Sequence, residues 1–222
     1  MAKVGVFDVL GPIMVGPSSS HTAGAVRLGN IAKAIAADEI QEVEFLLHGS
    51  FGKTYKGHGT DKALVAGIMG FETHDEKLRY SLDIAREKGL RVTFTERDLG
   101  DNHPNTVKIL MTCKNGKKCE VMGSSIGGGN IEVLEINGNK ATFSGVYPTI
   151  ITCHDDKMGT VAKISDILYK HHINIAFVNL GRTQKGKGAT MTCEVDSAIT
   201  DKVIEEIKAI EGINKVITIN PL

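Results

Sequence analysis

Apolar residues recur at helical and strand spacings through the first 145 residues. Residues 22–37 place apolar side chains three and four positions apart, which predicts a helix. Further helices are predicted at 60–70 and 75–89, each ending at a glycine. The segments with strand character are 42–48, 90–96, 106–113, 118–123, 131–136 and 140–145. The Asn-Gly-Asn sequence at 137–139 predicts a hairpin turn between the last two.

The pattern changes after Gly145. Strand, helix, strand, strand, helix and strand follow in the order βαββαβ, ending with the strand at 213–219. This order is typical of a ferredoxin-like split βαβ unit. The sequence therefore predicts an α+β protein with an N-terminal α/β domain at 1–145 and a second domain at 148–222, joined by the short segment "SGVYP".

Composition excludes several classes of protein. The 26 basic and 26 acidic residues give a formal net charge of zero without a long like-charge run, so nothing indicates nucleic-acid binding. No apolar stretch approaches the roughly 18 residues of a membrane span, and the start lacks the features of a signal peptide, so we expect a cytoplasmic protein. The four cysteines lack the pair spacing of zinc or ferredoxin-like sites, so no metal site is expected in this chain.

The segment "SSSHT" at 18–22 stands directly before the first predicted helix. Unpaired N–H groups at a helix start carry partial positive charge, and the Ser18, Ser19 and Ser20 hydroxyls can cap them or contact a carboxylate. His21 can move a proton near neutral pH. From these residues alone, a simple helix cap and an anion site are both open.

Two other segments combine glycine with reactive side chains. "GHGTD" at 57–61 places His58 between glycines before another helix start, where it is either a capped surface turn or part of a site. "SSIGGGN" at 124–130 is either a flexible connection or an anion-holding nest. It lacks the Walker and dinucleotide glycine patterns, and a pyridoxal phosphate cup would also need a Schiff-base lysine and a larger scaffold.

Together these segments resemble the beta chain of the iron–sulfur-dependent L-serine dehydratases, in the same order and at similar positions. The C-terminal unit, with "HDDKMGTVAKI" at 154–164, resembles an ACT domain. The resemblance covers nearly the whole chain. It implies that the N-terminal fold is similar to the allosteric substrate-binding domain of some phosphoglycerate dehydrogenases.

The resemblance further implies that L-serine is converted to pyruvate and ammonia with a 4Fe-4S cluster held by cysteines of an alpha chain, so that this chain alone is inactive. On that basis we expect His21 and His58 to be catalytic. Substrate binding is expected at Ser18, Ser19, Ser20, Thr22 and Asp61, with Asp61 in a position to orient His58. The partners implied are the alpha chain and L-serine, within a homodimer formed through the ACT domain or a heterotetramer.

The ACT-like half has its own candidate site. Asp155 or Asp156 can hold the ammonium group of an amino acid, and N–H groups near Gly159 its carboxylate, although ordinary helix capping explains these residues equally well. The remaining histidines are expected to be non-catalytic, with His103 exposed in a turn. A stand-alone amino-acid-binding regulator is the rival interpretation, but a sensor has little need of two histidine-bearing helix starts.

Overall fold

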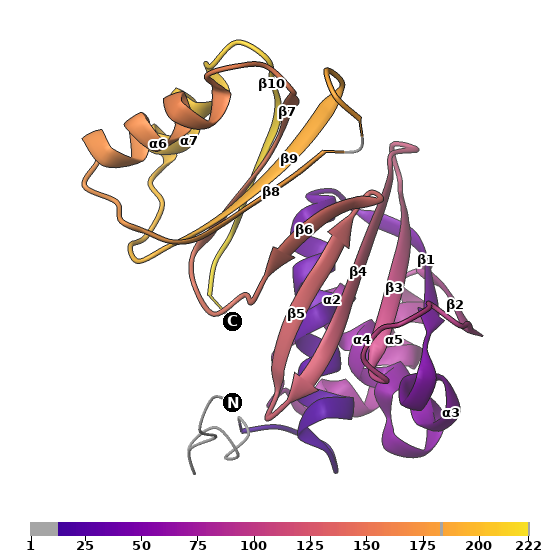
Figure 1. Cartoon of the computed structure of the whole chain (residues 1–222). Helices are drawn as coiled ribbons and strands as arrows, with labels where there is room; N and C mark the ends of the chain where they lie inside the picture. Colours follow the sequence, from indigo (N-terminus) through magenta and orange to yellow (C-terminus); the bar gives the residue numbers. More distant parts are fainter. Residues whose placement is uncertain (1–12, 183, 222) are drawn as a thin grey trace. The chain divides into compact units, whose positions relative to one another are not determined.

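The computed structural model describes residues 13–182 and 184–221. Its contacts divide the chain into two compact units, Met1–Val133 and Leu134–Leu222 (Figure 1). Each unit builds its own core. No helix in the described part of the chain is long and apolar enough to cross a bilayer.

The first unit combines helices with a mixed sheet whose strands lie in the order β2-β1-β3-β4, with β5 next. β1 is parallel to β2 and antiparallel to β3, and β3 is antiparallel to β4. The helical elements are η1 (Ser19–Ala23), α2 (Gly24–Ala36), α3 (Gly49–His58), α4 (Thr60–Met69), η2 (Glu76–Tyr80) and α5 (Ser81–Glu87). The strands are β1 (Ile40–Leu47), β2 (Arg91–Glu96), β3 (Thr106–Cys113), β4 (Lys118–Gly127) and β5 (Asn130–Ile136).

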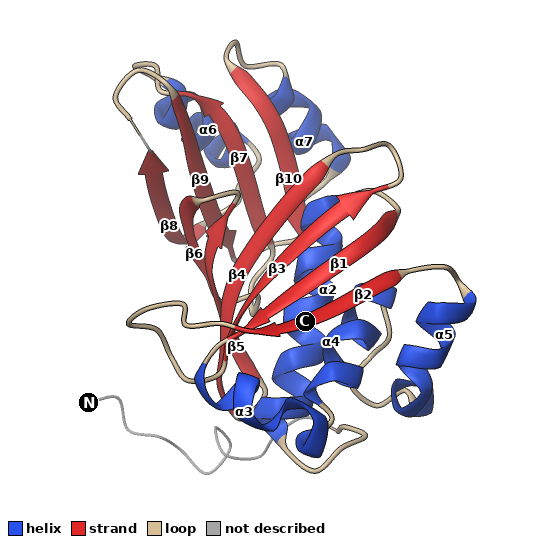
Figure 2. Cartoon of the chain, turned by 90° about the vertical axis from the view of Figure 1, so that its right-hand side faces the viewer, coloured by secondary structure: helices blue, strands red, loops and turns tan. Residues whose placement is uncertain are grey.

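The core of this unit lies between the sheet and the helices α2 and α4, which cover one face (Figures 1 and 2). Alternate residues of β1, such as Phe45, are fully buried, as the strand period of two requires. The two helices touch at glycines. A Cβ atom on Gly67 would lie 2.1 Å from the carbonyl oxygen of Val26 and 2.8 Å from the Cα of Gly29. Glycine at these positions therefore lets the two backbones approach closely.

The second unit contains the predicted ferredoxin-like arrangement. Its four-stranded sheet has the order β10-β7-β9-β8, with β9 antiparallel to both of its neighbours. The buried core, which includes Ile164, Leu168, Met191 and Val203, lies between sheet and helices. The elements are β6 (Asn139–Phe143), β7 (Thr149–Asp155), α6 (Thr160–Lys170), β8 (Ile175–Arg182), β9 (Gly188–Val195), α7 (Asp201–Lys208) and β10 (Ile213–Ile219).

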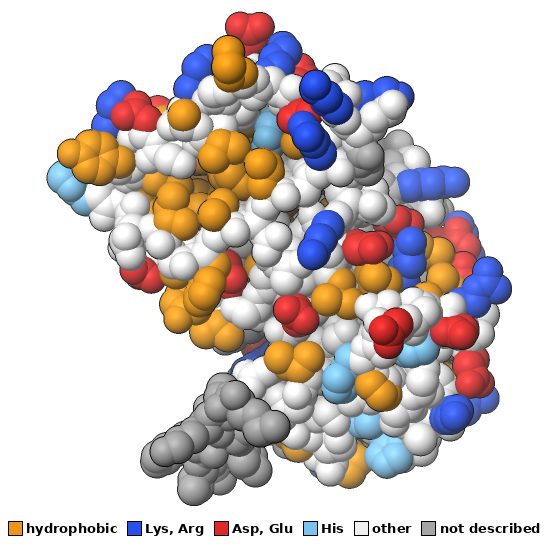
Figure 3. Space-filling model, in the orientation of Figure 1, with side chains coloured by type: hydrophobic (Ala, Val, Ile, Leu, Met, Phe, Trp, Pro, Cys, Tyr) orange, Lys and Arg blue, Asp and Glu red, His pale blue; other side chains and the backbone are white. Residues whose placement is uncertain are grey.

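The edge strand β8 exposes apolar side chains. Phe177, Val178 and Leu180 are each more than half exposed. Figure 3 shows apolar side chains gathered on this unit. An exposed apolar edge strand is available for pairing with another chain.

The α+β fold class and the hairpin turn are confirmed. Asn137 and Gly138 have φ angles of 51° and 74°, the two positive values that a type I′ turn needs. The predicted helix at 75–89 is split into the 3₁₀ turn η2 and the helix α5. The helix α3 was not predicted, because three glycines and few apolar residues hide its period. Burial of Phe51 holds this helix in place, and a Cβ on Gly52 would lie 2.8 Å from the carbonyl oxygen of Leu47.

Candidate active site

The segment predicted as a helix start forms a π-helical turn, η1, that runs directly into α2. The N–H of Gly24 donates to the carbonyl of Ser19, five residues back. Ser18 caps the turn, since its Oγ accepts from the backbone N–H of His21 at 3.2 Å. Short π-helical turns are frequent at functional sites. This turn contains His21.

Hydroxyl groups fix the imidazole of His21 from both sides. Its Nδ1 lies 3.1 Å from Ser20 Oγ, and its Nε2 lies 3.2 Å from Ser50 Oγ at the start of α3. Ser18 Oγ extends this network, at 3.2 Å from Ser20 Oγ. The ring also meets Phe51 edge-on, with centroids 5.3 Å apart. These contacts hold the His21 ring in its orientation.

His58 is the second ring of the site. Its centroid lies 4.9 Å from that of His21. It is the last residue of α3, and Gly59, at a φ of 70°, turns the chain into α4. Unlike His21, the His58 ring is exposed and makes no hydrogen bond in the described part of the chain. It borders a cavity of about 240 Å³. One imidazole is therefore partly buried in a hydroxyl network, and the other is open to a ligand.

Burial lowers the pKa of His21 below its usual value of 6.5, and the nearby His58 lowers it further. A proton on His58 thus disfavours a second proton on His21. At neutral pH, His21 is a neutral imidazole whose two nitrogens exchange hydrogen bonds with hydroxyls. His21 can therefore accept a proton without first losing one.

Thr22 and Asp61, two of the predicted substrate-binding residues, differ in their surroundings. Thr22 is buried and borders the same cavity as His58. Asp61 lies in the first turn of α4, where burial raises its pKa. Its carboxylate accepts from the backbone N–H of Lys62 at 2.8 Å, and within the described residues it has no hydrogen bond to His58. The roles of Ser18, Ser19, Ser20, Thr22 and Asp61 toward substrate stay predictions.

The "SSIGGGN" segment ends β4 beside the site. Ser124 and Ser125 are buried, and Ser124 Oγ lies 2.6 Å from Thr106 Oγ1. A Cβ on Gly24 would lie 2.0 Å from Ser125 Oγ, so glycine at the start of α2 makes room for this serine. Arg27 of α2 donates to the carbonyl oxygen of Gly129 at 2.7 Å, which ties the glycine turn to the same helix.

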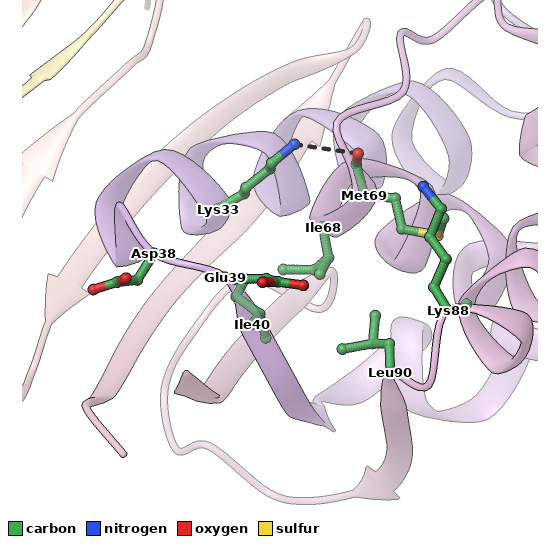
Figure 4. Close-up of a pocket in the computed structure, with 9 residues that line it drawn as sticks. Lys33, Asp38, Glu39, Ile40, Ile68, Met69, Lys88 and Leu90 are labelled. Atoms are coloured by element: carbon green, nitrogen blue, oxygen red, sulfur yellow. Dashed lines mark hydrogen bonds between the residues drawn. The ribbon is translucent and has the colours of Figure 1, made fainter. Parts of the chain in front are cut away.

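The sequence did not single out Ser50 and Phe51. Both contact His21 from 29 and 30 residues further along the chain, and their helix was itself not predicted. A second cavity of about 210 Å³ lies at the C-terminal ends of α2 and α4 (Figure 4). Its lining includes Lys33, Asp38 and Glu39, but none of the predicted site residues.

The metal-ligand side chains of this chain are scattered. Within residues 13–182 and 184–221, no three His, Cys, Asp or Glu side chains lie close enough together to hold a metal ion. Cys113, Cys119 and Cys193 are buried, and Cys153 is partly buried. Burial raises the pKa of the Cys193 thiol to about 11, which disfavours the thiolate that a metal needs. The described residues do not fit an iron–sulfur cluster.

In the second unit, the candidate ligand residues already have internal partners. Asp155 accepts from the amide of Asn214 at 3.1 Å, and Asp156 accepts from Arg182 and from the N–H of Gly186, both at 2.9 Å. Gly159 is the N-cap residue of α6, with a φ of 90°. The hydrogen bond from Asn214 is the main cause that lowers the pKa of Asp155, and the N–H of Gly186 does the same for Asp156. Regulatory binding at these residues stays a prediction.

The remaining histidines lie outside the pair formed by His21 and His58. His103 is exposed, as predicted. His154 is buried on β7, with Nδ1 3.2 Å from Thr152 Oγ1. His171, at the end of α6, contacts Glu206 at 3.1 Å. The absence of a catalytic role for these rings stays a prediction.

Two family models match the chain: "Serine dehydratase beta chain" over residues 5–85 and "ACT domain" over residues 149–212. The L-serine dehydratase beta chain of Peptoniphilus asaccharolyticus is 43% identical over 212 residues, covering 95% of this chain and 96% of its own length. A Bacillus subtilis protein named "Probable L-serine dehydratase, beta chain" is 42% identical over 211 residues, with the same coverage. The chain belongs to the L-serine dehydratase beta-chain family and carries a C-terminal ACT domain.

A more distant relative is the D-3-phosphoglycerate dehydrogenase of Methanocaldococcus jannaschii. It is 26% identical over 197 residues, which make up 88% of this chain and 37% of that protein. The likeness to phosphoglycerate dehydrogenase expected from the sequence is thereby confirmed.

Proposed function

We propose that this chain is the beta subunit of an L-serine dehydratase that converts L-serine to pyruvate and ammonia together with an alpha chain. The observation that carries the proposal is the pair of imidazole rings 4.9 Å apart, one held by serine hydroxyls and one open to a cavity. The names of the two beta-chain relatives support the substrate.

The proton on Cα of L-serine is weakly acidic, so the reaction needs a base that accepts it. Hydroxide is also a poor leaving group. We assign that role to His58, whose ring is exposed and borders the cavity. As the C–H bond breaks, its proton passes to His58 and its electron pair forms the C=C bond of aminoacrylate. The C–O bond breaks, and the departing hydroxyl takes the proton from His58 and leaves as water. Aminoacrylate then becomes an imine, which water hydrolyses to pyruvate and ammonia. His21, whose ring centroid lies 4.9 Å from that of His58, packs beside this ring and stays neutral.

The 4Fe-4S cluster of this proposal belongs to the alpha chain, since the described residues of this chain do not offer a cluster site. We further propose domains at 1–145 and 148–222 and a cytoplasmic location. The proposed assembly is a homodimer through the ACT domain or a heterotetramer. The exposed side chains of β8 support a contact at this edge.

Anaerobic co-expression with the alpha chain tests the proposal. The purified pair is expected to be brown and to release pyruvate from L-serine, whereas this chain alone is expected to be colourless and inactive. The mass of the pair in solution distinguishes the two assemblies. Turnover of L-serine by this chain alone, without iron, would contradict the proposal.

A further inference from the structure

The cavity beside His58 has two cationic side chains in its lining, those of Lys62 and Arg79. Its walls come from the segment 15–17, Thr22 of η1, the His58 turn, Lys62 of α4 and Arg79 of η2. Among the described residues that line it, none is acidic. The Lys62 ammonium makes no hydrogen bond or ion pair within that part of the chain. The positive charge of Lys62 acts to lower the pKa of the neighbouring Asp61, but Asp61 does not line the cavity. Such a cavity favours an anion.

The second observation is a buried hydroxyl without a partner. Thr22 is 1% exposed, and its Oγ1 makes no hydrogen bond to any described residue. Gly16 closes over it, since a Cβ there would lie 2.5 Å from Thr22 Oγ1. An unsatisfied buried hydroxyl is costly, and an acceptor in the cavity that Thr22 borders removes that cost.

The start of α4 also lies at the cavity, since both Gly59 and Lys62 line it. The backbone N–H of Lys62 already donates to the carboxylate of Asp61 at 2.8 Å, so the helix start itself adds little to anion binding. Two independent features, the Lys62 ammonium and the Thr22 hydroxyl, therefore point to one kind of ligand group.

We infer that this cavity binds the carboxylate of L-serine, with Lys62 as its counter-ion and Thr22 Oγ1 as a hydrogen-bond donor. Arg79 contributes less, because its guanidinium already pairs with Glu76 at 3.4 Å. The inference rests on the proposed function and deepens it. With the carboxylate beside Lys62, Cα lies toward His58, which borders the same cavity.

Steady-state kinetics of the complex assembled with the alpha chain test this assignment. Lys62→Met is expected to raise KM for L-serine about tenfold or more, with kcat changed less than about threefold, because it removes a charge-assisted contact to bound substrate. Lys62→Arg keeps the charge and is expected to restore most of the affinity. Lys56→Met is the matched control, since Lys56 also acts on Asp61 but does not line the cavity.

The outcomes separate this inference from the proposed function. An active wild-type complex in which Lys62→Met and Lys56→Met have the same KM overturns the carboxylate assignment alone. A wild-type complex without turnover overturns both. In the isolated full chain, L-serine but not L-serinamide is expected to shift the backbone amide resonances of Thr22 and Lys62; equal shifts with both compounds also contradict the assignment.

Discussion

Replacing His58 with alanine is expected to lower kcat of the assembled complex at least about 100-fold, the lower end of the contribution of a positioned general base. The reason is geometric: this ring is exposed toward the cavity, while both nitrogens of His21 have hydroxyl partners. The measurement is initial-rate pyruvate release at saturating L-serine.

The fold should tolerate this change. The His58 ring is exposed, and a Cβ on either neighbouring glycine, Gly57 or Gly59, would meet nothing within 4 Å. The matched control is His103→Ala, another exposed histidine, which is expected to leave the rate unchanged. His21→Ala is expected to lower kcat of the assembled complex at least about tenfold. A His58→Ala complex that retains the wild-type rate would remove the base assignment.

The largest expected effect on stability follows from Gly67→Ala. The added methyl would fall 2.1 Å from the carbonyl oxygen of Val26, so α2 and α4 must move apart along a fully buried contact. Overpacking of this kind is expected to lower the free energy of unfolding by about 2–3 kcal/mol, as measured by urea denaturation of the full chain.

The control for Gly67→Ala is Gly57→Ala on α3, where a Cβ meets nothing within 4 Å. Alanine at this exposed helical position is expected to be neutral or to stabilise by up to about 1 kcal/mol. Equal free energies of unfolding for the Gly67→Ala and Gly57→Ala variants would contradict this prediction, because they would show that α2 and α4 can move apart without loss of stability.

Much of the fold could be predicted from sequence because its elements are amphipathic. β3 spans the predicted residues 106–113, and the βαββαβ order of the second unit follows from period alone. The helix α3 could not be predicted in this way. Its conformation depends on packing of Phe51 and on the close approach of Gly52 to β1, which are tertiary contacts.

Part of the candidate site could also be predicted from sequence, and part of it could not. The motifs drew attention to His21 and His58, and the structure places their rings together. Ser50 escaped notice because a lone serine within a glycine-rich segment carries no periodic signal. Lys62 escaped because a lysine on an exposed helical position resembles any other until the cavity beside it is visible.

The central claim is that this chain contributes one wall of an active site completed by another polypeptide. A structure of the complex with the alpha chain and L-serine, determined without air, tests it most directly. We predict that His58 lies within hydrogen-bond or proton-transfer reach of the substrate, about 3 Å, on the side that faces the partner's cluster. L-serine bound at the cluster with His21 and His58 in contact only with solvent would contradict it.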